Sequence, residues 1–154
     1  MAGTYGTDNG IALTDTIGSE CFWRDFDKTY ANLFHGLRQD SGDPFEWGER
    51  AIAKYKELGI DPKTKALIFS DSLDIATAIE LHGRFSQHTN VSFGIGTTLS
   101  NAANKEKLNI VMKVVECNGR PVAKISDSPG KAICTDQEYL GYLQRAIDWR
   151  INND

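Results

Sequence analysis

Short apolar runs alternate with longer stretches of helical periodicity along the chain before Leu108. Such alternation is typical of a parallel sheet whose strands are joined by crossover helices, so we predict an α/β fold. In such folds the loops that follow the strands converge on one side of the sheet, where ligands bind. The predicted strands cover residues 11–14, 35–38, 66–70 and 91–93.

The clearest predicted helix follows the second strand. Asp43 is a preferred N-cap residue, Pro44 suits the first helical position, and Glu46 lies three residues after the cap. This helix ends at Gly59, and its apolar stripe consists of Ile52, Tyr55 and Leu58. Two more helices are predicted from their apolar stripes. One begins near Ser72 and carries Ile75, Ile79 and His82; the other carries Leu140, Leu143 and Ile147.

Beyond Leu108 the pattern changes to two β-rich runs, residues 109–116 and 120–125, separated by Cys117-Asn118-Gly119. Asn-Gly is a strong signal for the tight turn of a β-hairpin, so we expect an antiparallel hairpin beside the parallel sheet. Because no repeat, low-complexity tract or long linker interrupts the chain, we predict a single domain over residues 1–154.

Composition limits the classes of function. The chain has 17 basic and 21 acidic residues, a formal net charge of -4, and this balance does not indicate nucleic acid as a partner. Its three cysteines lack C-x-x-C spacing, which argues against a disulfide framework or a zinc site. No apolar run approaches the ~20 residues that span a bilayer, and the first residues do not resemble a signal peptide. We expect a cytoplasmic protein without membrane partners.

Arg38 and Asp40 stand at the end of the second predicted strand. An arginine fork suits a carboxylate or a phosphate, and an aspartate at a strand end suits ribose hydroxyls or a magnesium ion. The alternative is that the two side chains form a weak surface ion pair with each other.

Asp71 ends the third predicted strand and also has two interpretations. Aspartate is a preferred N-cap, so Asp71 is a candidate to cap the following helix. A carboxylate at the carboxyl end of a strand is equally a candidate to face a ligand, and both roles can coexist.

The stretch Gly94-Ile95-Gly96-Thr97-Thr98 follows the fourth predicted strand. Glycines let the backbone approach an anion, and successive amides can form a nest for phosphate oxygens. A plain tight turn is the alternative, because the stretch is neither a Walker loop nor a complete dinucleotide fingerprint.

The remaining polar candidates carry weaker signals. His35, His82 and His88 have no metal-ligand spacing and no partner nucleophile, so we interpret them as ordinary side chains. Residues 126–131, with the sequence SDSPGK, are predicted to form a solvated turn.

Five stretches follow one another along nearly the whole chain: GIALTDT (10–16), GLRQDSGDP (36–44), LIFSDSLD (67–74), SFGIGTTL (92–99) and ECNGRPVAKISDSPGK (116–131). Each alone is a weak signal. In this order and at these intervals they resemble the nicotinate phosphoribosyltransferase family, in the C-terminal half of its enzymes. The Asn-Gly turn leading into SDSPGK is especially specific.

The resemblance implies a partial irregular α/β barrel of the type II phosphoribosyltransferase kind, with the hairpin near residues 109–125 as an appendage. Family members transfer phosphoribosyl from phosphoribosyl pyrophosphate to nicotinate, giving nicotinate mononucleotide for NAD biosynthesis, with ATP hydrolysis coupled to the reaction. The resemblance places Arg38 in the nicotinate and ribose region and Asp40 and Asp71 on the ribose hydroxyls. It places the amides of the 94–98 loop, with Gly94, Gly96 and Thr97 foremost, on the 5′-phosphate.

The resemblance also implies Mg²⁺ and ATP as cofactors, with Asp15, beside Thr16, approaching magnesium or pyrophosphate. The family's N-terminal portion and its phosphorylated histidine are expected to lie outside this chain. We therefore name no catalytic residue, and we expect the chain to need that portion, or a second subunit, for activity.

Two other interpretations remain. The chain is alternatively a noncatalytic module that keeps the phosphoribosyl and phosphate site and turns nothing over. A third, weaker interpretation is an aldolase-like barrel enzyme, which needs a catalytic lysine inside the barrel; Lys113 and Lys124 are its candidates.

Overall fold

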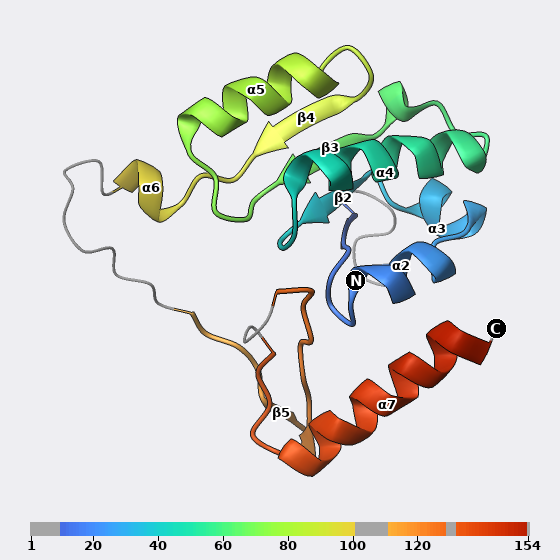
Figure 1. Cartoon of the computed structure of the whole chain (residues 1–154), viewed down its shortest axis with the longest axis vertical. Helices are drawn as coiled ribbons and strands as arrows, with labels where there is room; N and C mark the ends of the chain where they lie inside the picture. The colour runs from blue at the N-terminus through green and yellow to red at the C-terminus, as the bar shows by residue number, and fades with distance from the viewer. Residues whose placement is uncertain (1–9, 101–110, 129–131, 154) are drawn as a thin grey trace. The chain divides into compact units, whose positions relative to one another are not determined.

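The structure, a computed structural model, describes residues 10–100, 111–128 and 132–153. These residues pack as two compact units (Figure 1). The sheet unit falls within Met1–Leu13 and Phe26–Asn109, and the hairpin unit falls within Thr14–Asp25 and Ile110–Asp154. The single domain predicted for residues 1–154 stays a prediction.

A parallel sheet of four strands forms the centre of the sheet unit, in the order β1-β2-β3-β4. Each predicted strand is present, and its ends differ from the prediction by no more than one residue. The predicted α/β class is therefore confirmed. The strands are β1 (Ile11–Leu13), β2 (Gly36–Gln39), β3 (Ala66–Phe69) and β4 (Asn90–Phe93).

Helices connect these strands, as parallel pairing requires. The helix α4 and the short 3-10 turn η1 join β2 to β3, and α5 joins β3 to β4 (Figure 1). The helical elements of the sheet unit are α3 (Lys28–Leu33), α4 (Pro44–Glu57), η1 (Pro62–Thr64), α5 (Ile75–Phe85) and α6 (Thr97–Ser100).

The predicted start of α4 is confirmed, and the predicted start of α5 is three residues early. Asp43 caps α4, because its Oδ1 accepts hydrogen bonds from the amides of Phe45 and Glu46, both at 2.9 Å. In α5 the cap is Asp74, whose Oδ1 accepts from the Thr77 amide at 2.8 Å. Ser72 has a φ of 53°, a left-handed conformation that no helical residue adopts.

The core of the sheet unit lies where α4 and α5 meet the sheet around Phe69. The Phe69 ring stacks on Phe85 of α5, with centroids 5.6 Å apart, and meets Trp47 of α4 edge-on at 5.4 Å. Gly48 permits this approach, since a Cβ there would lie 2.6 Å from Cζ of Phe85. Aromatic contacts thus fix both helices against β3.

The predicted buried face of α5 is wrong. Ile75 and Ile79 are 57% and 67% exposed, and His82 is exposed as well. The residues that face the core are Ala78, Leu81 and Phe85. Because α5 carries two apolar stripes, periodicity does not decide between them; the stacking of Phe85 on Phe69 does.

In the hairpin unit, α2 (Ser19–Asp25) packs against α7 (Gln137–Asn153), which confirms the predicted last helix. Arg150 of α7 pairs with Asp25 at 3.2 Å, and Arg24 donates a hydrogen bond to the main-chain carbonyl of Arg150. The predicted apolar stripe of α7 is half-buried.

The predicted hairpin turn is confirmed, but its strands are much shorter than predicted. Strands β5 (Glu116–Cys117) and β6 (Arg120–Pro121) pair antiparallel, while residues 111–115 have no regular structure. Asn118 and Gly119 have φ values of 51° and 71°, the left-handed pair that a type I′ turn requires. Pro121 has no N–H to donate, which weakens the antiparallel ladder at its second residue pair. Residues 109 and 110 of the predicted hairpin lie outside the described residues.

Candidate phosphoribosyl-binding site

The register of the parallel sheet aligns the carboxyl ends of three strands. Gln39 at the end of β2 pairs with Phe69, and Phe69 pairs with Phe93. The three following loops therefore begin side by side, at Asp40, Ser70 and Gly94. Ligands of open α/β sheets bind at this edge. The structure thus brings together the predicted site residues of the sheet unit.

Arg38 and Asp40 form an ion pair, with Nη2 of the arginine 3.1 Å from Oδ1 of the aspartate. Their side chains are 47% and 27% exposed, and a pair of that kind contributes only about 0–1 kcal/mol to folding. Arg38 also donates from Nε to Ser70 Oγ at 2.8 Å. The surface-pair interpretation is confirmed as a contact, and ligand binding by the two residues stays a prediction.

Asp71 does not cap α5, because Asp74 occupies that position. The Asp71 carboxylate accepts a hydrogen bond from Ser72 Oγ at 3.3 Å, and its amide donates to Gln39 Oε1 at 3.3 Å. The capping interpretation is therefore wrong. Asp71 is half-buried at the same sheet edge as Asp40, and its role toward a ligand stays a prediction.

The two glycines of the predicted phosphate loop have different surroundings. The Gly94 amide donates to the Phe69 carbonyl at 2.8 Å, and a Cβ at Gly94 would lie 3.1 Å from the Cβ of Ser70. Within the part of the chain that the structure describes, a Cβ at Gly96 would meet nothing within 4 Å. Thr97 and Thr98 begin α6 rather than extend the loop, and Ile95 between the glycines is half-buried. Phosphate binding by this loop stays a prediction.

Asp15 belongs to the hairpin unit, where its side chain is buried in a polar cluster. The carboxylate Oδ1 lies 3.1 Å from Lys124 Nζ, and Oδ2 accepts a hydrogen bond from Ser126 Oγ at 2.9 Å. Asp15 is 1% exposed, and the main-chain carbonyl of its neighbour Thr16 accepts from the Ile125 amide at 2.9 Å.

These contacts give Asp15 and Thr16 a structural role, since they join the turn after β1 to the segment 124–126. A carboxylate already in contact with an ammonium group is a poor ligand for Mg²⁺, which prefers several oxygen ligands and water. The donor set at Asp15 does not fit a magnesium site, and the approach of Asp15 to magnesium or pyrophosphate stays a prediction.

Two residues of the site edge were missed by the sequence reasoning, Gln39 and Ser70. Gln39 is 0% exposed and is hydrogen-bonded to both neighbouring loops, while Ser70 bonds Arg38 and the Gln39 carbonyl. Period-two alternation offers a signal for Gln39, because it shares the inward face of β2 with Leu37. A buried glutamine on a core face needs partners, and here the partners are the site loops.

The other candidates give no second site. Within the part of the chain that the structure describes, no cluster of three or more His, Cys, Asp or Glu side chains could hold a metal ion, and the cysteines are unpaired. Neither Lys113 nor Lys124 lies on the parallel sheet, which removes support for the aldolase-like interpretation. None of the described helices is long and apolar enough to cross a membrane. Residues 129–131 of the SDSPGK stretch lie outside the described residues.

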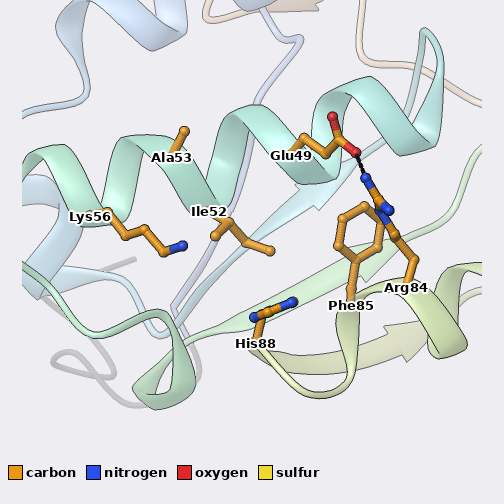
Figure 2. A pocket seen from close by; sticks show the side chains of 7 residues that line it. All are labelled: Glu49, Ile52, Ala53, Lys56, Arg84, Phe85 and His88. Carbon is orange, nitrogen blue, oxygen red and sulfur yellow. Dashed lines mark hydrogen bonds and ion pairs between the residues drawn. The ribbon is translucent and has the colours of Figure 1, made fainter.

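An open cavity of about 410 Å³ lies away from this edge, between α4 and α5 (Figure 2). Ile52 and Phe85 are among the residues that line it, and the ion pair between Arg84 and Glu49 lies at one end of the group of side chains that Figure 2 shows. None of the predicted site residues lines it. The cavity is a depression in the helical surface of the sheet unit and not part of the candidate site.

The chain is an α/β protein with acidic, basic and glycine-containing loops gathered at the carboxyl edge of its parallel sheet, the edge at which open α/β sheets commonly bind ligands. Comparison with models of known protein families identifies the family. The model of the nicotinate phosphoribosyltransferase (NAPRTase) family matches residues 2–150. The chain belongs to this family.

Its relatives are considerably longer than this chain. A nicotinate phosphoribosyltransferase of Chromobacterium violaceum is 56% identical over 143 residues, which cover 93% of this chain and 36% of the relative. The one of an Enterobacter species is 57% identical over 145 residues, covering 94% and 36%. The chain thus spans about a third of the length of these relatives.

Solved structures share the fold. The crystal structure of nicotinate phosphoribosyltransferase from Vibrio cholerae matches with a TM-score of 0.89 and 46% identity, covering 96% of this chain and 37% of that one. That of a putative nicotinate phosphoribosyltransferase from Saccharomyces cerevisiae matches with a TM-score of 0.83 and 33% identity, covering 96% and 38%. The parallel sheet with its small antiparallel pair is therefore a fold of this family.

Proposed function

We propose that this chain supplies the phosphoribosyl-binding part of a nicotinate phosphoribosyltransferase. The complete enzyme transfers phosphoribosyl from phosphoribosyl pyrophosphate to nicotinate, giving nicotinate mononucleotide for NAD biosynthesis. The observation that carries the proposal is the placement of Arg38, Asp40, Asp71 and Gly94 around one sheet edge in a member of this family.

In this proposal the carboxylates of Asp40 and Asp71 accept hydrogen bonds from the ribose hydroxyls, and Arg38 supplies positive charge in the nicotinate and ribose region. Amides of the 94–98 loop hold the 5′-phosphate. Pyrophosphate leaves the anomeric carbon through an oxocarbenium-like state. Catalysis at such a centre depends on positioning and electrostatic stabilisation, which these residues offer without a protein nucleophile.

The proposal includes a barrel completed by other segments of the enzyme. In the described residues β1 and β4 are the edges of the sheet, each paired on one side. Across the face opposite the helices, Arg38, Ile68 and Ser92 are neighbours in register, and none of them is buried. Unpaired parallel edges and an open face invite further strands and covering side chains.

Mg²⁺ and ATP are part of the proposal only because the family implies them. The substrate's pyrophosphate group is a ligand for Mg²⁺, so the metal needs no dedicated cage of protein side chains. We assign ATP to the part of the enzyme that this chain does not span, because no histidine of this chain matches the family's phosphorylated one.

The direct test mixes the chain with the separately produced remainder of a bacterial relative and measures nicotinate mononucleotide by chromatography. Binding of phosphoribosyl pyrophosphate to the chain alone is measured by calorimetry. We expect both, and we expect Asp40→Ala and Asp71→Ala to weaken binding while the fold, followed by circular dichroism, is kept. Absence of both binding and turnover contradicts the proposal.

The alternative is a noncatalytic phosphoribosyl-binding module. The observation in its favour is that the residues proposed to bind ribose and phosphate lie together in this chain, which spans only 36% of a full-length relative. Binding of phosphoribosyl pyrophosphate without any turnover in the complemented mixture would identify this module.

A further inference from the structure

Gln39 is a fully buried amide at the centre of the candidate site, with 0% of its surface exposed. It is the last residue of β2, between Arg38 and Asp40. Its Nε2 donates to the carbonyls of Ser41 and Gly42, each at 3.1 Å. One side of the amide is thereby attached to the loop after β2.

The other side of the same amide is attached to the loop after β3. Gln39 Oε1 accepts hydrogen bonds from the amides of Ser70 and Asp71, at 3.4 and 3.3 Å. These bonds are longer than the two made by Nε2, and the Ser70 amide also donates to the Gln39 main-chain carbonyl at 3.1 Å. Because the main-chain ladder already holds Ser70, the bond to the Asp71 amide is the contact with the loop after β3 that only the Gln39 side chain provides.

The orientation of this amide follows from its neighbours. With oxygen and nitrogen exchanged, the oxygen would face two carbonyl oxygens and the NH₂ group would face two N–H groups. In the observed orientation both donors and both acceptor positions are used. Glutamate has this shape but lacks the donors, and methionine has the length but no strong polar atom.

The two loops leave the sheet immediately beyond these bonds. Gly42 has a φ of 76° and Ser72 a φ of 53°, left-handed conformations that turn the backbone away from the strand direction. Asp40 lies before the first of these turns and Asp71 before the second. The Gln39 amide bonds each loop within two residues of its turn.

We propose that Gln39 is a positioning residue that fixes the loop carrying Asp40 relative to the loop carrying Asp71. It acts through the two loops and does not touch the ligand, and the inference rests on the proposed function. Ribose hydroxyls on adjacent carbons have a set spacing, so two carboxylates that bind them need a set spacing as well. Misplacement by about 1 Å is enough to lose much of such an interaction.

The test compares the wild-type chain with Gln39→Met, Gln39→Glu and the control Gln87→Met, which changes an exposed glutamine beyond α5. Gln39→Met removes all four bonds, whereas Gln39→Glu keeps the acceptor and loses the donors. Amide hydrogen exchange reports the loops, and calorimetry reports affinity for ribose 5-phosphate and phosphoribosyl pyrophosphate. Each variant is measured at a temperature where circular dichroism shows it folded.

We expect Gln39→Met to speed exchange of the Asp71 amide about tenfold and to lower affinity for both ligands about tenfold. Exchange of the Leu67 amide, inside β3, stays at the wild-type rate, which separates loop positioning from loss of the fold. Gln39→Glu keeps protection at Asp71 and still loses affinity; if it does not fold, Gln39→Met decides. The control changes neither quantity.

Wild-type affinity in a folded Gln39→Met chain overturns the inference and leaves the proposed function standing. Failure of the wild-type chain to bind either ligand overturns the proposed function and the ligand role of Gln39 with it. Equal losses at Asp71 and Leu67 also overturn the inference, because they mean that Gln39 supports the sheet as a whole.

Discussion

Arg38 Nε donates a hydrogen bond to Ser70 Oγ at 2.8 Å, from one strand of the sheet to the first residue beyond the next. The Ser70 hydroxyl in turn donates to the main-chain carbonyl of Gln39 at 2.7 Å. The guanidinium of Arg38 is thereby held from the side of β3 as well as by Asp40. A half-exposed arginine is thus held in one orientation, and in the proposed function this orientation would lower the entropy cost of binding a ligand.

We expect Ser70→Ala to lower the free energy of unfolding by about 1–2 kcal/mol, because it removes the two hydrogen bonds of the Ser70 hydroxyl. Affinity for phosphoribosyl pyrophosphate, measured on folded protein, should fall about threefold to tenfold, because Arg38 loses its hydrogen bond to Ser70. Urea denaturation and calorimetry measure the two effects. The control Ser86→Ala changes an exposed serine after α5 and should leave affinity unchanged.

Asp40 and Asp43 lie in one loop and have separable roles. Asp43→Ala removes the cap of α4 and should cost about 1 kcal/mol of stability, with little change in ligand affinity. Asp40→Ala breaks an exposed pair and should cost less than about 1 kcal/mol while weakening ligand binding at least tenfold. Thermal unfolding and calorimetry on both variants check this. The reverse pattern contradicts the proposed role of Asp40.

Gly94 and Gly96 provide a second matched pair. A Cβ at Gly94 would lie 3.1 Å from Ser70 Cβ, so Gly94→Ala should cost about 1 kcal/mol of stability through overpacking. A Cβ at Gly96 would meet no atom of the described residues within 4 Å, so Gly96→Ala should leave stability unchanged. If phosphate occupies that space, the methyl group lowers phosphate affinity about tenfold. Unaltered binding by Gly96→Ala argues against a phosphate site there.

Local signals in the sequence were sufficient for most of the fold. The strands follow from short apolar runs, α4 from Asp43 and Pro44, and the hairpin turn from Asn118-Gly119, all of which act within a few residues. The inward face of α5 is predicted wrongly because it depends on a tertiary contact, the stacking of Phe85 on Phe69. The shortness of the hairpin strands has a local cause, since Pro121 lacks an N–H that could continue the ladder.

The sequence predicts the residues of the candidate site but not the hydrogen bonds among them. Arg38, Asp40, Asp71 and Gly94 are singled out by their positions at or just after the ends of predicted strands, and the register of β2, β3 and β4 brings them to one edge of the sheet. The supports supplied by Gln39 and Ser70 were not identified, because side-chain bonds between residues about 30 positions apart leave no periodic pattern in a single sequence. The only sequence signal for Gln39 is its position on the inward face of β2.

Tyr55 carries a buried hydroxyl for which the described residues supply no hydrogen-bond partner. Burial raises the pKa of this phenol above its ordinary value of about 10. The folded state therefore keeps the proton after the unfolded state has lost it, and stability falls as the pH rises beyond about 10. Burial acts oppositely on Lys65, whose pKa is lowered, so Lys65 makes stability rise with pH up to about 10.5.

Tyr55→Phe should raise the free energy of unfolding at neutral pH by about 1 kcal/mol, since an unpaired buried hydroxyl is removed and the packing against Phe26 is kept. It should also remove the loss of stability above about pH 10. Subtracting the wild-type profile cancels the contribution of Lys65, which both chains share. Urea denaturation from pH 7 to 11 measures this, and a lower stability at neutral pH would show that the hydroxyl has a partner.

The Asp15 and Lys124 pair distinguishes a structural carboxylate from a metal ligand. Asp15 is 1% and the Lys124 side chain 19% exposed, so removing one partner leaves the other charge poorly solvated. Asp15→Ala and Lys124→Met should each destabilise the chain by about 3 kcal/mol, and the double variant by clearly less than the sum. Asp148→Ala, an exposed position in α7, is the control and should leave the free energy of unfolding unchanged.

Thermal unfolding with and without 5 mM Mg²⁺, roughly a saturating concentration for a millimolar site, tests the magnesium interpretation of Asp15. A stabilisation by Mg²⁺ that disappears in Asp15→Asn would support the magnesium interpretation. Strong coupling to Lys124 without any response to Mg²⁺ would instead support the structural role, in which Asp15 holds the turn after β1 to the segment 124–126.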